Sequence, residues 1–421
     1  MKRRALAAVL LVLAAASPAF AQYTLTTLAS FNGSDGNSPL AGLTLSGSTL
    51  YGTTVNGGAN DDGEVFSVPV TGGTPTVLAS FNGSNGSLPS ADLTLSGNTL
   101  YGMTYLGGVI DRGEVFSVPV SGGTPTMLAS FNGSNGQNPV AGLTLSGSIL
   151  YGTTEFGGAN NDGEVFSVPV SGGTPTVLAS FNGSNGEYPV AGLTLLDSTL
   201  YGTTYQGGAN GYGEVLSVPV SGGTPTVLAS FNGSNGIGPQ AGLNLLGSTL
   251  YGTTFYGGAN GDGEVFSLPV TGGTPTVLAS FNGSNGEKPV AGLTLSGSTL
   301  YGSTEFGGAN NDGEVFSVPL TGGTPTVLAS FNGSNGESPV ASLTLSGSAL
   351  YSTTEEGGAN DDGTVFELAV PEPTTASLLA ITSLALLRRT RRLPPNTEFD
   401  AGLVRRCPKK PRNVTSGANI F

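Results

Sequence analysis

Short stretches of alternating hydrophobic and polar residues recur along most of the chain, and they predict β-strands. In one representative segment, four such stretches cover residues 76–81, 91–95, 99–104 and 114–120. In the first of them, Val77, Ala79 and Phe81 fall on the same face of an extended backbone. Short runs with a period of two and many β-branched and aromatic residues are typical of strands, and no segment of the body has the periodicity of a helix. The pattern therefore predicts an all-β body.

The residues between these strands are those that tight turns require. Ser96-Gly97 lies between the second and third strands and suits a two-residue hairpin whose glycine has a positive φ. Asparagine, aspartate and glycine at 82–86, 107–113 and 121–125 supply the other connections. The segment is thus expected to contain four short antiparallel strands.

This segment is one copy of a unit that occurs seven times with a period of 50 residues. Ser-Phe-Asn-Gly places its phenylalanine at 31, 81, 131, 181, 231, 281 and 331. Seven units with four strands each predict a seven-bladed β-propeller over residues 22–370. A β-solenoid is the alternative, but solenoids usually end in polar capping repeats, whereas the units at 23–70 and 323–370 look like the others.

Motifs within each unit resemble a known bacterial repeat. Leu-Tyr-Gly-Thr-Thr at 50–54, Gly-Gly-Ala-Asn at 57–60 and Asp-Gly-Glu-Val-Phe-Ser at 62–67 together resemble the GloVer tandem repeat. That family occurs on secreted bacterial proteins with varied C-terminal anchors, a choice-of-anchor arrangement, and the resemblance covers residues 23–370. It implies an exported or surface protein and adds little chemistry.

The first 21 residues have the three parts of a secretory signal peptide. Residues 2–4 form a basic start, residues 5–16 form a short apolar stretch, and Ala19-Phe20-Ala21 ends in the small residues of a cleavage site. An uncleaved anchor is the alternative, but the apolar stretch is too short to favour it. We expect cleavage after Ala21, so that Gln22 begins the mature chain.

Residues 371–392 carry a second targeting signal. Pro371-Glu372-Pro373 is followed by a short apolar stretch and a cluster of arginines that ends at Arg392. This order of parts resembles the PEP-CTERM sorting signal of bacterial envelope proteins. The resemblance implies transient insertion of a short apolar transmembrane helix into the inner membrane. It also implies processing near Pro371, Glu372 and Pro373 by an exosortase, followed by release or transfer to the cell surface. An ordinary C-terminal membrane anchor is the alternative.

Residues 393–421 follow the arginine cluster, although such signals usually end soon after it. This tail contains Cys407, the single cysteine of the chain, and has no periodic hydrophobic pattern, so we expect it to be disordered. A cytoplasmic remnant that is lost on processing and an artefact of the reading frame are both open interpretations.

Composition narrows what the body can do. The chain has no histidine and one cysteine, which excludes histidine-based catalysis and any cysteine-based zinc or disulfide framework. Residues 22–370 contain only two basic residues, Arg112 and Lys288, against 25 acidic ones. A body with so few cations cannot neutralise phosphates, so nucleic acid and anionic membrane surfaces are excluded as its partners.

The most acidic motif is Asn-Asp-Asp-Gly-Glu at 60–64, which recurs with changes in the other units. Its oxygens could supply some ligands of calcium, but the spacing does not match an EF-hand loop. We favour a tight turn held by the asparagine and aspartate side chains. Paired carboxylates could also hydrolyse glycosides, but a catalytic pair should stand out in one or two units, and these positions repeat. We therefore assign no catalytic residue, metal ligand or cofactor, with calcium left open.

The residue pairs that precede Gly-Gly vary between units and are often aromatic or acidic. They include Val55-Asn56, Tyr105-Leu106, Glu155-Phe156, Tyr205-Gln206, Phe255-Tyr256 and Glu355-Glu356. Each pair would lie at the same strand end of its blade, so together they could line one rim. Aromatic side chains on a rim suit contact with sugars or peptides, and packing against the neighbouring blade is the alternative.

These observations predict an exported, surface-sorted propeller that acts as a structural or binding module of the envelope or extracellular matrix and is not an enzyme. Its expected partners are an exosortase-type processing enzyme and, as one candidate, extracellular polysaccharide. The runner-up function is a polysaccharide-active or calcium-dependent extracellular enzyme.

Overall fold

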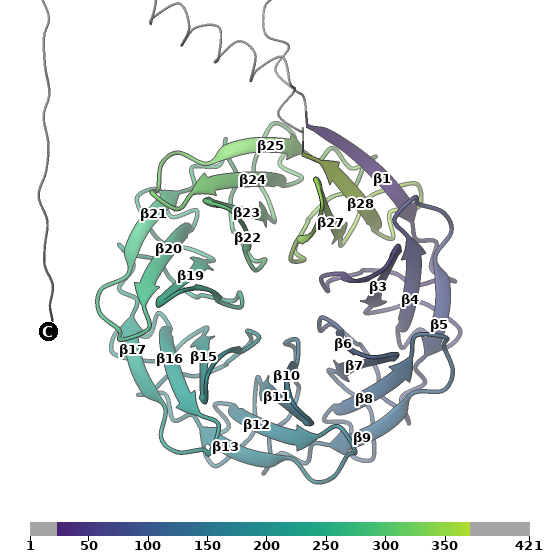
Figure 1. The fold of residues 1–421 in the computed structure, drawn as a ribbon, viewed down its shortest axis with the longest axis horizontal. Helices are drawn as coiled ribbons and strands as arrows, with labels where there is room; N and C mark the ends of the chain where they lie inside the picture. The colour runs from purple at the N-terminus through teal and green to yellow at the C-terminus, as the bar shows by residue number, and fades with distance from the viewer. Residues whose placement is uncertain (1–22, 371–421) are drawn as a thin grey trace, which may run out of the picture. The chain divides into compact units, whose positions relative to one another are not determined.

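A computed structural model describes residues 23–370, and this part of the chain contains 28 strands joined by turns and loops. The strands form seven four-stranded sheets, arranged as blades around a central axis (Figure 1). The prediction of a seven-bladed β-propeller is therefore confirmed, and the solenoid alternative is wrong. Nothing among residues 23–370 forms a helix long and apolar enough to cross a membrane. Outside the described residues lie Ala21, Pro371-Glu372-Pro373 and the tail 393–421.

Blade 1 contains, from the axis outwards, β2 (Thr44–Ser46), β3 (Thr49–Thr54), β4 (Glu64–Pro69) and β5 (Thr76–Ser80). Each strand pairs antiparallel with its neighbour. Blades 2 to 6 repeat this order with β6 (Thr94–Ser96), β7 (Thr99–Thr104), β8 (Glu114–Pro119), β9 (Thr126–Ser130), β10 (Thr144–Ser146), β11 (Ile149–Thr154), β12 (Glu164–Pro169), β13 (Thr176–Ser180), β14 (Thr194–Leu196), β15 (Thr199–Thr204), β16 (Glu214–Pro219), β17 (Thr226–Ser230), β18 (Asn244–Leu246), β19 (Thr249–Thr254), β20 (Glu264–Pro269), β21 (Thr276–Ser280), β22 (Thr294–Ser296), β23 (Thr299–Thr304), β24 (Glu314–Pro319) and β25 (Thr326–Ser330).

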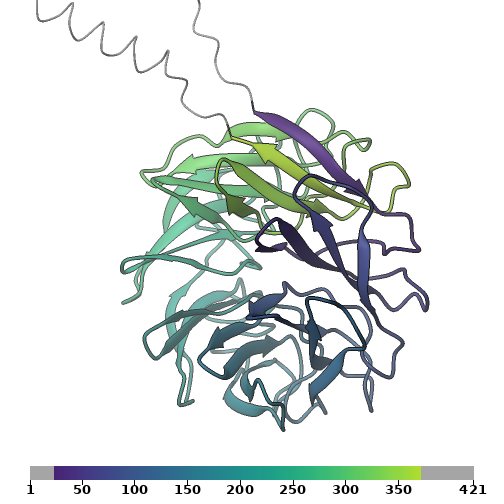
Figure 2. The ribbon, with the colours of Figure 1, turned by 45° about the vertical axis from the view of Figure 1, so that its right-hand side comes forward.

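Blade 7 closes the ring with strands from both ends of the described chain. Its inner strands are β26 (Thr344–Ser346), β27 (Ala349–Thr354) and β28 (Thr364–Ala369), and its outer strand is β1 (Thr24–Ser30). β1 pairs antiparallel with β28, beside which it lies in Figure 2. The sequence unit 23–70 therefore does not coincide with a blade, because its first strand belongs to blade 7 and its other three to blade 1. With β1, blade 7 has four strands like the other blades, and the ring is closed at the junction.

The hydrophobic core consists of seven clusters, and each cluster takes its side chains from two neighbouring blades. In the cluster between blades 1 and 2, Val65 of blade 1 packs with Phe116 of blade 2. The ring of Phe81 meets that of Phe116 edge to face, with centroids 5.0 Å apart. The equivalent phenylalanine pair occurs in every cluster except the one between blades 3 and 4, where Leu216 replaces the second phenylalanine. No blade buries its own core, so the blades stabilise one another.

The outer strand departs from simple alternation. Ala79 and Val77 pair with consecutive residues of β4, so Leu78 is left over as a β-bulge. Ala79 and Phe81 are buried as expected, but Val77 is 38% exposed. The prediction that these residues share one face is therefore wrong for Val77, because the bulge shifts the alternation by one residue.

Two of the remaining predicted strands agree closely with the structure, and one agrees only in part. The third and fourth strands, predicted at 99–104 and 114–120, are observed at Thr99–Thr104 and Glu114–Pro119. The second strand is shorter than the predicted 91–95 and covers Thr94–Ser96. The predicted hairpin between the second and third strands is confirmed, and Gly97 in it has a φ of 59°.

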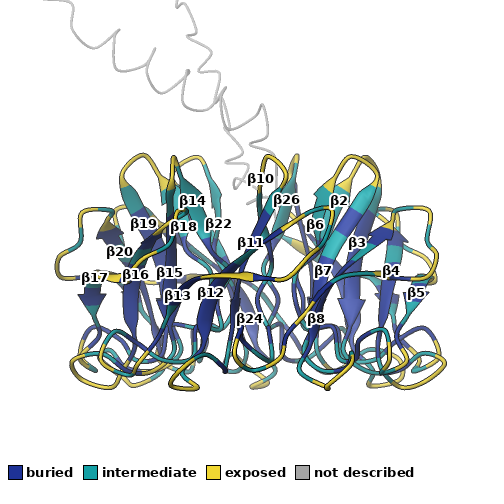
Figure 3. Ribbon diagram, turned by 90° about the horizontal axis from the view of Figure 1, so that it is seen from below, coloured by how far each residue is buried: buried dark blue, intermediate teal, exposed yellow. Residues whose placement is uncertain are grey.

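The connections between strands lie on two opposite faces of the ring (Figure 3). One face carries the hairpins at 47–48 and the turns at 70–75, with their equivalents in the other repeats. The opposite face, called the loop face below, carries the loops 31–43 and 55–63 and their equivalents. Every candidate side chain discussed below belongs either to the loop face or to the channel that opens there.

Candidate functional site

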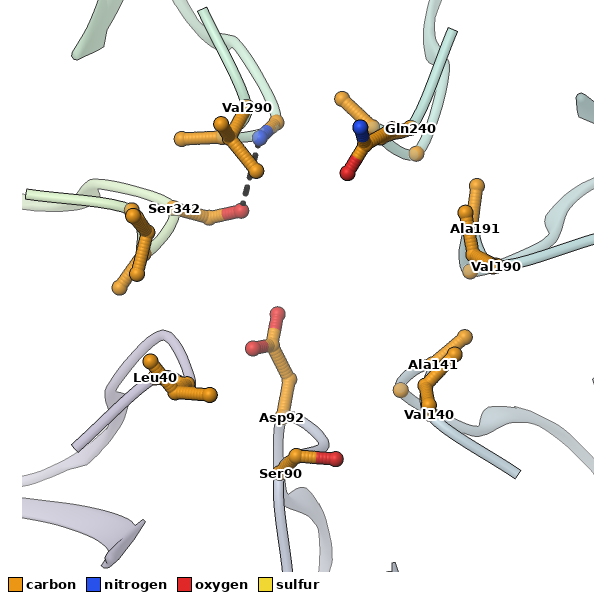
Figure 4. Close-up of a pocket in the computed structure, with 18 of the residues that line it drawn as sticks. Leu40, Ser90, Asp92, Val140, Ala141, Val190, Ala191, Gln240, Val290 and Ser342 are labelled. Carbon is orange, nitrogen blue, oxygen red and sulfur yellow. Dashed lines mark hydrogen bonds between the residues drawn. The ribbon is translucent and has the colours of Figure 1, made fainter. Parts of the chain in front are cut away.

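A channel follows the axis of the ring and contains a cavity of about 950 Å³. The residues just before each innermost strand line this cavity. Figure 4 shows side chains from several blades around the axis, among them Leu40, Val140 and Gln240, with Asp92 extending toward the centre. Because the lining comes from different blades, the cavity exists only in the closed ring.

Asp92 and Ser342 break an otherwise uniform ring of glycines. The equivalent residue in each of the five other repeats is glycine, as at Gly42 and Gly292. Asp92 Oδ1 accepts a hydrogen bond from Gly42 N at 2.6 Å. Ser342 Oγ accepts one from Gly292 N at 3.1 Å, which is the dashed line in Figure 4. Burial raises the pKa of Asp92 above its ordinary value. At this position of the channel wall, Asp92 and Ser342 therefore add polar side chains that the other five repeats lack.

Five of the residues that precede Gly-Gly line the same cavity. They are Glu155, Tyr205, Phe255, Glu305 and Glu355, one from each of blades 3 to 7. The expectation that these positions gather at one rim is confirmed for them.

The same side chains also contact neighbouring blades, as the alternative interpretation predicted. The Tyr205 ring lies against Gly238 of blade 5, where an added Cβ would be 2.6 Å from Tyr205 Cε2. Phe156 meets Tyr188 of blade 4 edge to face, with ring centroids 5.2 Å apart. The rim and packing interpretations therefore describe one arrangement, in which contacts between blades position the side chains of the rim.

A second variable pair lies directly beside the first and was missed by the sequence analysis. Asn37 N donates to Asn56 O at 2.9 Å, Asn56 N donates to Asn37 O at 3.1 Å, and Val55 N donates to Ser38 O at 3.1 Å. The equivalent backbone bridge between these two loops occurs in every blade. We refer to residues 37, 38, 55 and 56 and their equivalents as the variable positions.

The side chains at the variable positions change from blade to blade while their surroundings do not. Gly36, Pro39 and Gly57-Gly58 are the same in all seven repeats. Between them, the residue equivalent to Ser38 changes through Ser38, Leu88, Asn138, Tyr188, Gly238, Lys288 and Ser338. Comparison of the repeats position by position would have found this signal in the sequence. Only the fold places it beside the pairs that precede Gly-Gly.

Residue 38 and its equivalents also have a backbone conformation that favours glycine. Tyr188 has a φ of 58° and Lys288 a φ of 55°, in the left-handed region, and all seven equivalents share it. An ordinary residue there costs on the order of 1–2 kcal/mol. Glycine is used at neighbouring left-handed positions such as Gly36 and Gly57, yet at this position it occurs once in seven repeats. Side chains are therefore retained here against a conformational cost, which is typical of functional positions.

The variable positions are acidic as a set. They hold seven glutamates and one basic residue, Lys288. Burial raises the pKa of Glu155, Glu305 and Glu355, and for Glu355 the charges of Glu356 and Glu305 add to this effect. The mouth of the channel therefore combines aromatic rings with closely spaced carboxyl groups.

The acidic motif at 60–64 is a turn, as the sequence analysis favoured. Asn60 Nδ2 donates to Phe81 O at 2.8 Å, and Asp61 Oδ1 accepts from Gly57 N at 2.9 Å. Glu64 begins β4 with 2% exposure, and its Oε1 accepts a hydrogen bond from Ser80 Oγ at 2.9 Å. Within residues 23–370 no group of three acidic, histidine or cysteine side chains is arranged to hold a metal ion. Asn60 thus ties the motif to the next loop, Asp61 closes its own turn, and Glu64 bonds to the adjacent outer strand through Oε1, while its Oε2 is buried without a partner in the described part of the chain.

Comparison with known proteins supports the repeat assignment. The chain matches the Gloeobacter/Verrucomicrobia repeat over residues 17–216 and 196–390. None of the curated proteins compared with the chain matches it. Among solved structures it is similar to that of a Mycobacterium tuberculosis puromycin-hydrolyzing peptidase, with 14% sequence identity and a TM-score of 0.39, over 81% of this chain and 62% of that one. That likeness is too weak to bear on function. Because the repeat matches cover most of the chain, the protein belongs to the Gloeobacter/Verrucomicrobia repeat family.

Proposed function

We propose that the protein is a non-catalytic binding module of the cell envelope or extracellular matrix and that the loop face is its binding surface. The observation that carries this proposal is the change of side chain at the variable positions on an invariant backbone. A binding surface benefits from this arrangement, because the geometry is kept while the contacts are adapted to a ligand. Structural packing alone would favour the same side chain in every blade.

Export and sorting form part of the proposal and rest on the two ends of the sequence. Residues 1–21 have the order of a signal peptide, and residues 371–392 have the order of a PEP-CTERM signal. An exosortase-type enzyme would process the chain at Pro371-Glu372-Pro373 and leave the ring at the cell surface or in the medium.

The ligand class that the loop face supports best is an extracellular polysaccharide. Tyr205 and Phe255 border a cavity of about 950 Å³, large enough to admit sugar residues. The flat faces of aromatic rings pack against the C–H groups of pyranose rings. Carboxylates such as Glu155 and Glu355 beside them accept hydrogen bonds from hydroxyl groups.

A binding panel with the full chain tests this function. Neutral, cationic and anionic glycans would be titrated with and without a chelator, and the products would be examined for cleavage. We expect at least one glycan class to bind without cleavage, and Tyr205→Ala to weaken that binding. Equal binding by Tyr205→Ala, or no binding by any glycan, would contradict the proposal. Release of shorter sugars would favour the runner-up function as a polysaccharide-active enzyme.

A further inference from the structure

Aromatic side chains occupy variable positions in four successive blades, from Phe156 in blade 3 to Phe306 in blade 6, and we call this set the aromatic arc. Phe156 meets Tyr188 at 5.2 Å, which joins blades 3 and 4. Tyr205 of blade 4 lies against Gly238 of blade 5, and Phe255 meets Tyr256 within blade 5 at 4.3 Å. Blades 3 to 6 thus present aromatic rings in succession around the mouth of the channel. A polymer whose units repeat the same apolar face could contact several of these rings at once.

The far end of this arc already holds a primary ammonium group. Lys288 Nζ lies 4.5 Å from the centroid of the Phe306 ring and 5.7 Å and 5.8 Å from those of Tyr256 and Phe255. All three distances fall within the range of cation–π attraction. Glu287 Oε1 is 3.7 Å from the same Nζ. An ammonium group on a short carbon chain is therefore stabilised here by rings and a carboxylate together.

Blade 7 contains three carboxylates at its variable positions that are not paired with a basic side chain of the described residues. Glu337, Glu355 and Glu356 occupy three of its four variable positions. Among residues 23–370, the pair between Lys288 and Glu287 is the single ion pair, so none of these three carboxylates has a basic partner there. Glu337 and Glu355 are half-buried and Glu356 is exposed, which leaves all three open to a ligand.

Blades 1 and 4 contribute neutral groups that suit hydroxyls. Asn56 of blade 1 and Gln206 of blade 4 carry amides at the variable positions. The amides of Asn37, Gln137 and Asn138 already form hydrogen bonds with Asp362, Arg112 and the Tyr105 backbone. Amides donate and accept hydrogen bonds, as sugar hydroxyls do. The loop face therefore combines amides and aromatic rings for sugar residues with carboxylates for positive charge.

We propose that the loop face binds a glycan with free amino groups, a polymer of unacetylated hexosamine. The sugar rings would lie on the aromatic arc of blades 3 to 6, and the ammonium groups would pair with Glu337, Glu355 and Glu356. This inference rests on the proposed function and narrows its ligand. Anionic glycans are disfavoured because residues 22–370 contain 25 acidic residues and only two basic ones, so the body would repel them. A lysine-rich peptide would satisfy the carboxylates and could place ammonium groups over the rings, as Lys288 does. It lacks the flat sugar face that repeats along a glycan, so it is the competing ligand that the test must separate.

Calorimetric titration of the full chain at low salt tests this inference with four probes. They are a glucosamine oligomer, the N-acetylglucosamine oligomer of the same length, an oligolysine of the same charge and a uronic acid oligomer. The measurement would be made at about pH 6, where most aliphatic amines are charged. We expect the glucosamine oligomer to bind at least about tenfold more tightly than each of the other three.

Two variants locate the binding, and a third serves as a control. Glu337→Gln/Glu355→Gln/Glu356→Gln should weaken binding of the glucosamine oligomer by about tenfold and leave that of the N-acetylated oligomer unchanged. Tyr205→Ala should weaken both. Asp197→Asn, which alters a hairpin on the opposite face, should change neither.

The outcomes separate this inference from the proposed function. Equal or tighter binding of the N-acetylated oligomer would overturn the inference and leave glycan binding in place. Equal binding of oligolysine would overturn it because sugar rings would then be unnecessary. If the triple variant bound the glucosamine oligomer as tightly as the unaltered chain, the assignment to blade 7 would be wrong. If none of the probes bound, this inference would be rejected, whereas the proposed function would be rejected only if the wider glycan panel also failed to bind.

Discussion

Truncation of one core phenylalanine should lower the stability of the whole ring. Phe281 is fully buried in the cluster between blades 5 and 6, and its ring meets that of Phe316 at 4.9 Å with an interplanar angle of 69°. Phe281→Ala removes the buried ring and leaves a cavity, which costs about 3–5 kcal/mol. The aromatic pair accounts for about 0.5–1.5 kcal/mol of this loss.

The expected change in melting temperature follows from the size of the ring. Roughly 350 residues with an unfolding entropy of about 2.1 cal/mol/K each give about 0.7 kcal/mol/K. Phe281→Ala should therefore lower the melting temperature by about 4–7 °C. Phe181→Ala is the matched comparison, because Phe181 packs beside Leu216 and has no ring partner there. The melting temperature should fall by about 1–2 °C less for Phe181→Ala than for Phe281→Ala.

Scanning calorimetry of the full chain distinguishes a cooperative ring from separate units. Because each core cluster belongs to two blades and β1 joins blade 7 to the start of the described chain, we expect one transition for both variants. Its calorimetric and van't Hoff enthalpies should agree. Two well-separated peaks would show that blades melt independently and would refute the reasoning from shared clusters. An unchanged melting temperature for Phe281→Ala would refute the estimate of the core contribution.

Three further predictions concern the fourth blade, the buried glutamates and the C-terminal signal. Leu216→Phe should raise the free energy of unfolding by about 1 kcal/mol, because the space above Gly202 is free where the equivalent Gly152 is covered by the ring of Phe166. A lower melting temperature would show that the site cannot accept the ring. Glu164 is 2% exposed, and burial raises its pKa in the folded protein. The buried carboxylate therefore does not destabilise the folded protein at a pH below the pKa of the unfolded state, and the loss of stability grows as the pH rises toward the pKa of the folded state. Glu164→Gln should therefore unfold at higher urea than the unaltered chain at neutral pH and at the same urea at about pH 4; a less stable variant at neutral pH would reveal an additional partner of the carboxylate. If Pro371-Glu372-Pro373 is a processing site, mass spectrometry of the surface or medium fraction should find no peptide from 393–421, and that tail attached to exported protein would favour a plain anchor.

The sequence by itself determined the number of blades, the number of strands in each and the main turns. Strand alternation and turn chemistry are local properties, so Thr99–Thr104 and the Ser96-Gly97 hairpin could be predicted from a few neighbouring residues. The sevenfold period supplied the count, since identical units must adopt equivalent structures. The variable pairs before Gly-Gly were also visible in the sequence, because the repeats could be compared with one another.

The tertiary structure alone decided which residues meet across the ring. β1 pairs with β28 because the accumulated rotation of seven blades brings the two ends together, and no local pattern encodes that distance. Burial of Glu64 at the start of β4 follows from the loop 55–63 and the outer strand β5, which bring Gly58 and Ser80 against its carboxylate. The exposure of Val77 follows from a bulge. The pairing of residues 37–38 with 55–56, which creates the variable positions, likewise depends on a backbone bridge between separate loops. The proposed binding surface is therefore a property of the closed ring, because its side chains belong to different blades and meet only when the blades pack.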